Sequence, residues 1–160
     1  MVVAIAIALS ITIPALAESG FDHDSTNVQG TVKATIDVDS PNSAILLTTQ
    51  IIPGDTAAGS GIVNVLCNKN TWSLAASATA PGKMTDGHGN TLHNALQVQD
   101  SASAYQELGG AAITLISGQS ATTSTPQGVT ANFHQLGDWN DIASGYNYSL
   151  SVTFTGSMTP

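Results

Sequence analysis

The stretch at residues 60–78 limits the possible folds of this chain more than any other, because apolar residues alternate with polar ones along both of its halves. In the first half, Val63, Val65 and Cys67 occupy every second position. The matching positions in the second half are Trp72, Leu74, Ala76 and Ala78. A period of two is expected when one side of a strand is buried. Because residues 68–70 between them favour a polar turn, we predict a central β-hairpin on which the other strands pack.

The same alternation recurs before and after this stretch, separated by Gly, Pro, Asn and Asp turn signals. Further strands are predicted at residues 29–39, 44–52, 92–98, 102–108, 112–117, 129–134 and 146–155. We find no helical period of useful length after residue 17. About eight or nine short strands with one apolar face predict an all-β fold. We expect an antiparallel β-sandwich, Ig-like or jelly-roll-like, over residues 29–160.

The first 17 residues resemble a secretory signal peptide. An apolar run ends at Pro14, and Ala15, Leu16 and Ala17 follow as a small-x-small cleavage pattern. No Lys or Arg precedes the run, so either the start of the sequence is truncated or the signal is atypical. The structural alternative is a retained hydrophobic helix, as in type IV pilins, or a membrane anchor. The run is too short to span a bilayer comfortably, and we expect no stable membrane insertion once it is removed. Residues 18–28 are predicted to be a flexible leader to a secreted domain.

The charge of the chain excludes some partners. It holds three Lys, no Arg and eleven acidic residues, for a net charge of -8. So few cations cannot neutralise several phosphates, and we therefore predict no nucleic-acid partner. Attraction to an anionic lipid surface fails for the same reason. The lone Cys67 provides no intrachain disulfide and is expected to be a small buried residue.

Residues with catalytic potential are scattered, since His23, His88, His93 and His134 form no known catalytic motif and no G-x-S-x-G occurs. We predict no catalytic residues and no cofactor. Two loops do hold metal-ligating residue types, and each more often reflects solvated loop polarity. They are Asp86, His88 and His93 for a transition metal, and Asp138, Asn140 and Asp141 for calcium.

The strand predicted at residues 29–39 carries the assembly hypothesis. Its apolar face consists of Val32, Ala34, Ile36 and Val38. Because a flexible leader precedes it, this strand can pair in its own sheet, or swing out and complete the sheet of a neighbour. Repeated head-to-tail donation builds a filament unless the rotation closes a ring. The sequence leaves both arrangements open.

Four segments together resemble secreted β-domain proteins of archaea, especially methanogens: SGIVNVLCNKNTWSL, GKMT at residues 82–85, LHNALQV at 92–98 and the closing YNYSLSVTFTGS. The W-x-L element at Trp72 is also similar to WxL-type cell-surface domains. A weaker resemblance is to camelysin/TasA-like matrix fibre subunits and archaeal bundling pili. These resemblances imply an extracellular location, a sandwich fold and, for the fibre subunits, assembly by strand donation.

We therefore predict a non-enzymatic structural subunit of the cell surface or of an extracellular filament, with self-association as its main interaction. The alternative is a carbohydrate-binding or adhesive module for a cell-surface glycan. There Trp139 would stack on a sugar ring, although it could instead cover the end of the sandwich. Asn147 begins an N-x-S sequon and is a possible glycosylation site.

Overall fold

The computed structural model describes residues 28–122 and 124–159, and within these ranges every regular element is a strand. The predicted signal peptide at residues 1–17 and most of the predicted leader lie outside them. The chain divides into two units, Met1–Val32 and Lys33–Pro160, and the second contains all of the strands. These are β1 (Ile36–Asp39), β2 (Thr56–Cys67), β3 (Trp72–Ala78), β4 (Gln97–Gln99), β5 (Tyr105–Glu107), β6 (Ile113–Gln119), β7 (Gln127–Leu136) and β8 (Val152–Met158).

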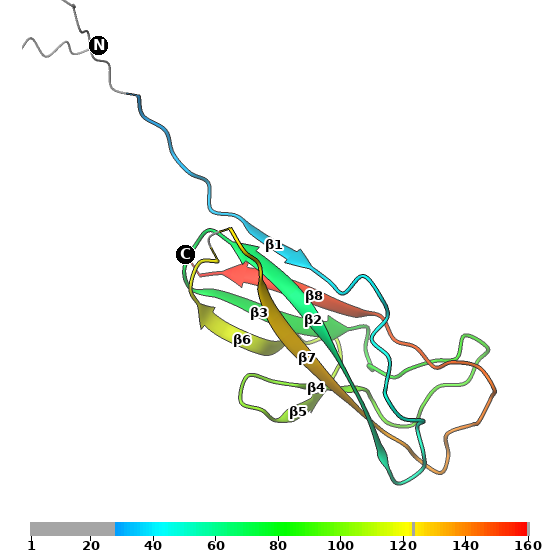
Figure 1. The fold of residues 1–160 in the computed structure, drawn as a ribbon. Coiled ribbons are helices and arrows are strands. Elements are labelled where there is room, and N and C mark those ends of the chain that lie inside the picture. Colours follow the sequence, from blue (N-terminus) through cyan, green and yellow to red (C-terminus); the bar gives the residue numbers. More distant parts are fainter. Residues whose placement is uncertain (1–27, 123, 160) are drawn as a thin grey trace, which may run out of the picture. The chain divides into compact units, whose positions relative to one another are not determined.

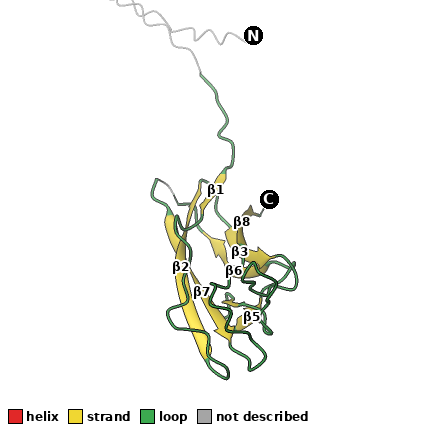
Figure 2. Ribbon diagram, turned by 90° about the vertical axis from the view of Figure 1, so that its right-hand side faces the viewer, coloured by secondary structure: helices red, strands yellow, loops and turns green. Residues whose placement is uncertain are grey.

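The strands form two antiparallel sheets that pack face to face (Figures 1 and 2). One sheet has five strands in the order β1-β2-β7-β4-β5, and the other has three in the order β6-β3-β8. The long pair of β2 and β7 runs in register from Thr56 opposite Leu136 to Val65 opposite Gln127. The antiparallel sandwich predicted from the alternation is confirmed.

The core lies between the two sheets and follows the period of two. Every second residue of β3 is buried from Trp72 to Ala78, and β2 is buried in the same way from Val63 to Cys67. Val98 of β4 and Phe133 of β7 complete the five-stranded side of this core. Such burial removes apolar surface from water on both sheets at once, which is the main source of stability in a sandwich without disulfides.

The predicted hairpin at residues 60–78 is wrong in its pairing, although its buried residues are as predicted. β2 pairs with β1 and β7, whereas β3 pairs with β6 and β8, so the two halves lie in opposite sheets. The short connection at residues 68–71 crosses from one layer to the other, with Thr71 at a φ of 63°. A hairpin and a crossing connection direct the same alternate side chains inward, and the period therefore cannot distinguish them.

The strand predicted at residues 44–52 does not form. Instead, the backbone N–H and the hydroxyl of Thr48 both donate to the carbonyl oxygen of Ala58, at 2.7 and 3.0 Å. Ile45 packs against the core, while Leu46 and Ile52 are exposed. Three consecutive apolar residues at 45–47 give no period of two, which is why this segment covers β2 as an irregular chain rather than a strand.

The last strand begins later than predicted, at Val152 instead of residue 146. The preceding residues are held outside the sheet, because Ser149 and Thr85 exchange backbone hydrogen bonds of 2.8 and 3.0 Å. The hydroxyl of Tyr148 donates to the carbonyl oxygen of Ile142 at 2.7 Å. These contacts make residues 146–151 part of the loops at one end of the domain.

Candidate functional site

The N-terminal strand is shorter than its sequence pattern. β1 pairs with β2 through only four residues, from Ile36 opposite Cys67 to Asp39 opposite Asn64. Of the four predicted donor residues, Ile36 and Val38 are half-buried against the core, whereas Ala34 and Val32 are exposed and lie in no strand. The structure thus places half of the predicted apolar face inside its own domain.

The position of Asn68 explains why β1 does not pair with β2 upstream of Ile36. β2 ends at Cys67, and Asn68 begins the crossing to the other sheet. Its side-chain oxygen accepts from the Thr35 N–H at 2.7 Å, its backbone N–H donates to the Thr35 carbonyl at 3.2 Å, and its amide nitrogen donates to the Lys33 carbonyl at 2.9 Å. Residues before Lys33 therefore have no remaining length of β2 to pair with.

The apolar alternation nevertheless continues upstream. Val32 is 90% exposed, and Val28, in phase with it, is 88% exposed. The prediction began this strand at residue 29 and so missed Val28. The same period of two, read one step further, would have found it. A strand pattern of about eleven residues at 28–38 thus has a partner for its last few residues only.

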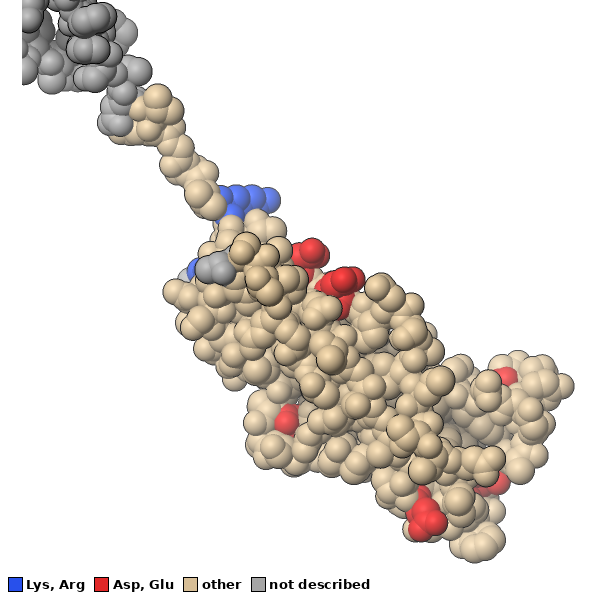
Figure 3. Space-filling view, viewed as in Figure 1, with Lys and Arg blue, Asp and Glu red and all other residues tan. Residues whose placement is uncertain are grey.

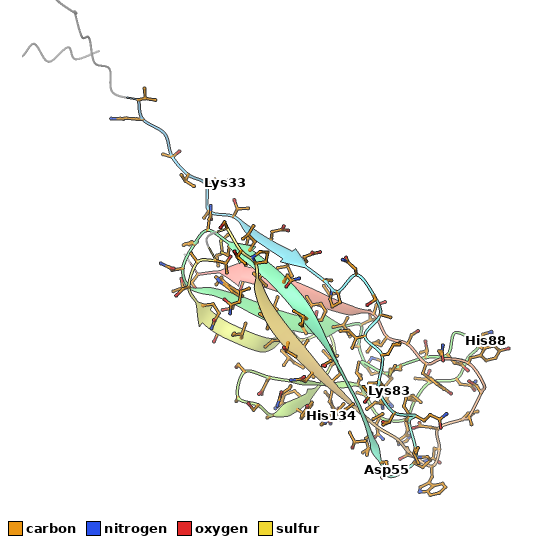
Figure 4. The ribbon with its side chains drawn as sticks, viewed as in Figure 1. Lys33, Asp55, Lys83, His88 and His134 are labelled. Atoms are coloured by element: carbon orange, nitrogen blue, oxygen red, sulfur yellow. The ribbon has the colours of Figure 1, made fainter. Side chains whose placement is uncertain are left out.

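Loops fill the end of the domain opposite Lys33, where Figure 4 places His88 and Asp55. In one of them the Asp86 carboxylate is buried and accepts from the N–H of His88 at 2.8 Å and of Asn90 at 3.1 Å, and from the Asn90 side-chain amide at 2.6 Å. The Asn90 amide, these N–H groups and Ser144 hold the pKa of Asp86 well below its ordinary value, because each favours the charged form.

Trp139 lies in a second loop, at residues 138–141, between two aspartates whose hydrogen bonds stabilise the loop. The Asp138 carboxylate accepts from the N–H and the side-chain amide of Asn140, which lowers the pKa of Asp138. Asp141 accepts from the N–H of Asp138 at 2.8 Å and of His93 at 2.7 Å. Trp139 itself is 86% exposed. The idea that it covers the end of the sandwich is therefore wrong.

We predict no metal site, and the candidate metal ligands Asp86 and His88 already contact other protein groups. His88 stacks on Tyr146, with ring centroids 3.8 Å apart, and the Asp86 oxygens accept from Asn90 and His88 instead. In the described part of the chain, no group of three or more His, Cys, Asp or Glu is placed to hold a metal ion. The structure does not bring Asp86, His88 and His93 together as ligands.

His88 and His134 lie in different parts of the domain. His134 of β7 stacks on Tyr105 of β5, with centroids 3.6 Å apart and an interplanar angle of 7°. Figure 4 shows it well apart from His88. His23 lies outside the described residues. Since each aromatic contact covers a ring face, these imidazoles serve as packing groups.

Gln135 is a polar residue in the core that the sequence did not single out. It continues the buried positions of β7 after Phe133 and is fully buried. Its amide nitrogen donates to the carbonyl oxygens of Asn94 and Leu136, at 3.2 and 3.0 Å, while its Oε1 has no partner in the described part of the chain. Gln135 thus ties the loop at residue 94 to β7. Its place in phase with Val129, Ala131 and Phe133 was the available signal.

The remaining predicted positions are placed as follows. Cys67 is buried, as predicted, and its thiol donates to the carbonyl oxygen of Lys69 at 3.3 Å. Asn147 is exposed in the loop before β8. Figure 3 shows few charged side chains on the visible face, in keeping with the charged fraction of 9%.

The chain matches no protein-family model, and no curated protein matches it in sequence. Among residues 28–122 and 124–159, no helix is long and apolar enough to cross a membrane.

Proposed function

We propose that this protein is a non-enzymatic structural subunit, secreted to the cell surface or into an extracellular filament, that self-associates by pairing its N-terminal strand with a neighbouring copy. One observation carries the proposal. The apolar alternation of β1 extends upstream through Ala34, Val32 and Val28, where β2 no longer offers a partner.

Pairing with a strand of a neighbouring copy would stabilise this segment in two ways. Its backbone N–H and C=O groups would form hydrogen bonds to the neighbouring strand, and its valine side chains would be buried. Burying one Val is worth roughly 1.5–3 kcal/mol, so Val28 and Val32 together supply a moderate driving force. Each copy would donate one strand and accept one, and such a heterologous contact extends into a filament unless its rotation closes.

The proposal is tested by removing residues 18–32, which leaves β1 and the three hydrogen bonds of Asn68 in place. The shortened protein should melt within a few degrees of the full mature chain, because Val28 and Val32 are not packed in the core. It should remain monomeric by light scattering and form no filaments under negative stain. Polymers that persist in this variant would overturn strand pairing as the basis of assembly.

Two neighbouring substitutions provide a matched pair. Val32→Asp places a charge on the apolar face of the segment, and Thr31→Asp places the same charge on its polar face. Assembly should be lost in the first and retained in the second, since only the first charge would be buried on pairing. Equal behaviour of the two variants would show that the apolar face is not used.

A second candidate function is glycan binding at Trp139. The observation in its favour is an indole that is 86% exposed on a loop fixed by the hydrogen bonds of Asp138 and Asp141. An exposed aromatic face can stack on a sugar ring. Trp139→Ala should abolish retention on immobilised cell-surface polysaccharide, and Trp139→Phe should keep part of it. Unchanged retention with the alanine variant would reject this site.

A further inference from the structure

The edges of the two sheets differ in how well they are protected against pairing with another chain. The edge strands are β1 and β5 in one sheet and β6 and β8 in the other. Proteins commonly protect such edges with short strands, charges, bulges or covering loops. β1 has four residues, two of them Asp, and β5 has three, including Glu107. Both of these edges are thus short and acidic.

β6 is protected in a different way. Its register against β3 shifts twice, and the N–H of Ser101 donates to the carbonyl oxygen of Thr114 at 2.9 Å. Within residues 28–122 and 124–159, β8 has none of these devices. It pairs with β3 over seven residues in unbroken register, from Met158 opposite Trp72 to Val152 opposite Ala78, and contains neither a charged residue nor Pro. Its edge is the longest regular one that lacks protection.

The backbone groups along this edge point outward. Ala78, the partner of Val152, donates its N–H to Gly109, on the side of β3 away from β8. In an antiparallel pair, two residues that lie opposite each other either both direct their N–H and C=O groups toward the partner strand or both direct them away from it. Val152, Phe154, Gly156 and Met158 therefore present N–H and C=O groups to the outer edge of β8.

The inner side chains of β8 are also incompletely covered. Val152, Phe154 and Met158 are half-buried, whereas the inward residues of β3 are buried. The side chains of Ile36 and Val38 in β1 approach Gly156 from the opposite sheet and lie within 3 Å of the position that a Cβ on Gly156 would occupy. The backbone of β1 is hydrogen-bonded to β2 and not to β8. The edge of β8 thus offers both a hydrogen-bonding ladder and an apolar strip.

We propose that the edge of β8 is the acceptor and that residues 28–35 of a second copy are the strand it receives. This inference rests on the proposed function, because it names the surface used in self-association. The lengths match, with eight residues for a strand of seven. The faces match as well, since Val28, Val32 and Ala34, with Gly30 between the valines, alternate with polar residues, and so do Val152 and Phe154. Neither partner carries an acidic residue.

The segment that pairs with β8 comes from another copy, because the chain's own segment is fixed at its C-terminal end, at Lys33 and Thr35. The three hydrogen bonds of Asn68 hold Lys33 and Thr35 in line with β1, past the end of β2. Reaching β8 of the same chain would require a reversal between Thr35 and Ile36, and these bonds leave no residues for a turn.

Disulfide trapping between two full mature chains tests the assignment. One chain carries Thr31→Cys in the donor segment and the other carries Thr155→Cys on the outer face of β8. The control partner carries Thr114→Cys on β6, since Thr114 and Thr155 both lie opposite Ala75, on its two sides. Cys67 is buried in both chains and serves as a constant background. We expect cross-linked dimer with the β8 variant at about tenfold or more over the β6 variant.

Equal trapping at β6 and β8, or trapping only at β6, would overturn the β8 assignment while leaving self-association intact. No trapping at either position, together with a monomeric mass by light scattering, would overturn the proposed function as well.

Discussion

The two tryptophans of this chain lie in regions built on different principles. Trp72 has 0% of its surface exposed, between the sheets, and its indole N–H donates to the carbonyl oxygen of Ser120 at 2.7 Å. Trp139 is 86% exposed on a loop that depends on carboxylate hydrogen bonds. The strand region is held by apolar burial and the loop region by polar contacts. Substitutions in the two regions should therefore differ in size and in their dependence on pH.

The largest effect is expected for Trp72→Ala. Loss of the indole leaves a cavity between the sheets and an unpaired carbonyl at Ser120, so the free energy of unfolding should fall by about 3–5 kcal/mol. Chemical denaturation followed by circular dichroism measures this change. Trp72→Phe should lose less, because a ring still fills most of the space. A loss under about 1 kcal/mol for the alanine variant would contradict the assignment of Trp72 to the core.

Gly82→Ala should give the next largest loss, at the boundary between the two regions. Gly82 has a φ of +75°, and an added Cβ would meet the carbonyl oxygen of Leu108 at 1.8 Å. The backbone would have to move, at a cost above about 2 kcal/mol. Gly118→Ala is the matched control, with a φ of +64° and nothing within 4 Å. Thermal melts should show the larger decrease for Gly82→Ala, and equal decreases would argue against the close approach.

The loop region should be sensitive to acid through Asp86. Its pKa in the folded protein lies below the ordinary value of 3.8, so its contribution to stability is present above that pH and is lost as pH falls further. The melting temperature should therefore drop as the pH falls from about 4 toward about 2. Asp86→Asn should lower it at neutral pH and reduce its dependence on pH.

Asp39→Asn is the control for this experiment, because it removes one exposed charge and none of these hydrogen bonds. An Asp86→Asn protein whose melting temperature follows the same course with pH as the parent would show that another group causes the acid sensitivity.

The smallest effect on stability is expected for Trp139→Ala. Because the Trp139 side chain is mostly in solvent, it buries little apolar surface on folding. The free energy of unfolding of the variant should therefore stay within about 0.5 kcal/mol of the parent. Chemical denaturation followed by circular dichroism compares it directly with Trp72→Ala. A decrease above about 1 kcal/mol would mean that the indole packs against the domain.

The alternation of the chain by itself determined which residues enter the core. Val63, Val65, Trp72 and Leu74 were predicted to be buried, and they are, because a strand directs successive side chains to opposite faces in any sheet. The same reasoning indicated an antiparallel sandwich and the apolar face of the N-terminal strand.

Only the tertiary structure decided which strands are neighbours. The connection between β2 and β3 crosses the sandwich, and the side chain of Asn68 binds the backbone of Thr35 and Lys33, a contact that the polar turn predicted at residues 68–70 does not indicate. Likewise, the tertiary structure buries Asp86, whose carboxylate accepts backbone hydrogen bonds within its own loop, whereas it leaves the indole of Trp139 in solvent. A period of two specifies a face of a strand, but pairing depends on the contacts between distant segments, and these exist only in the folded chain.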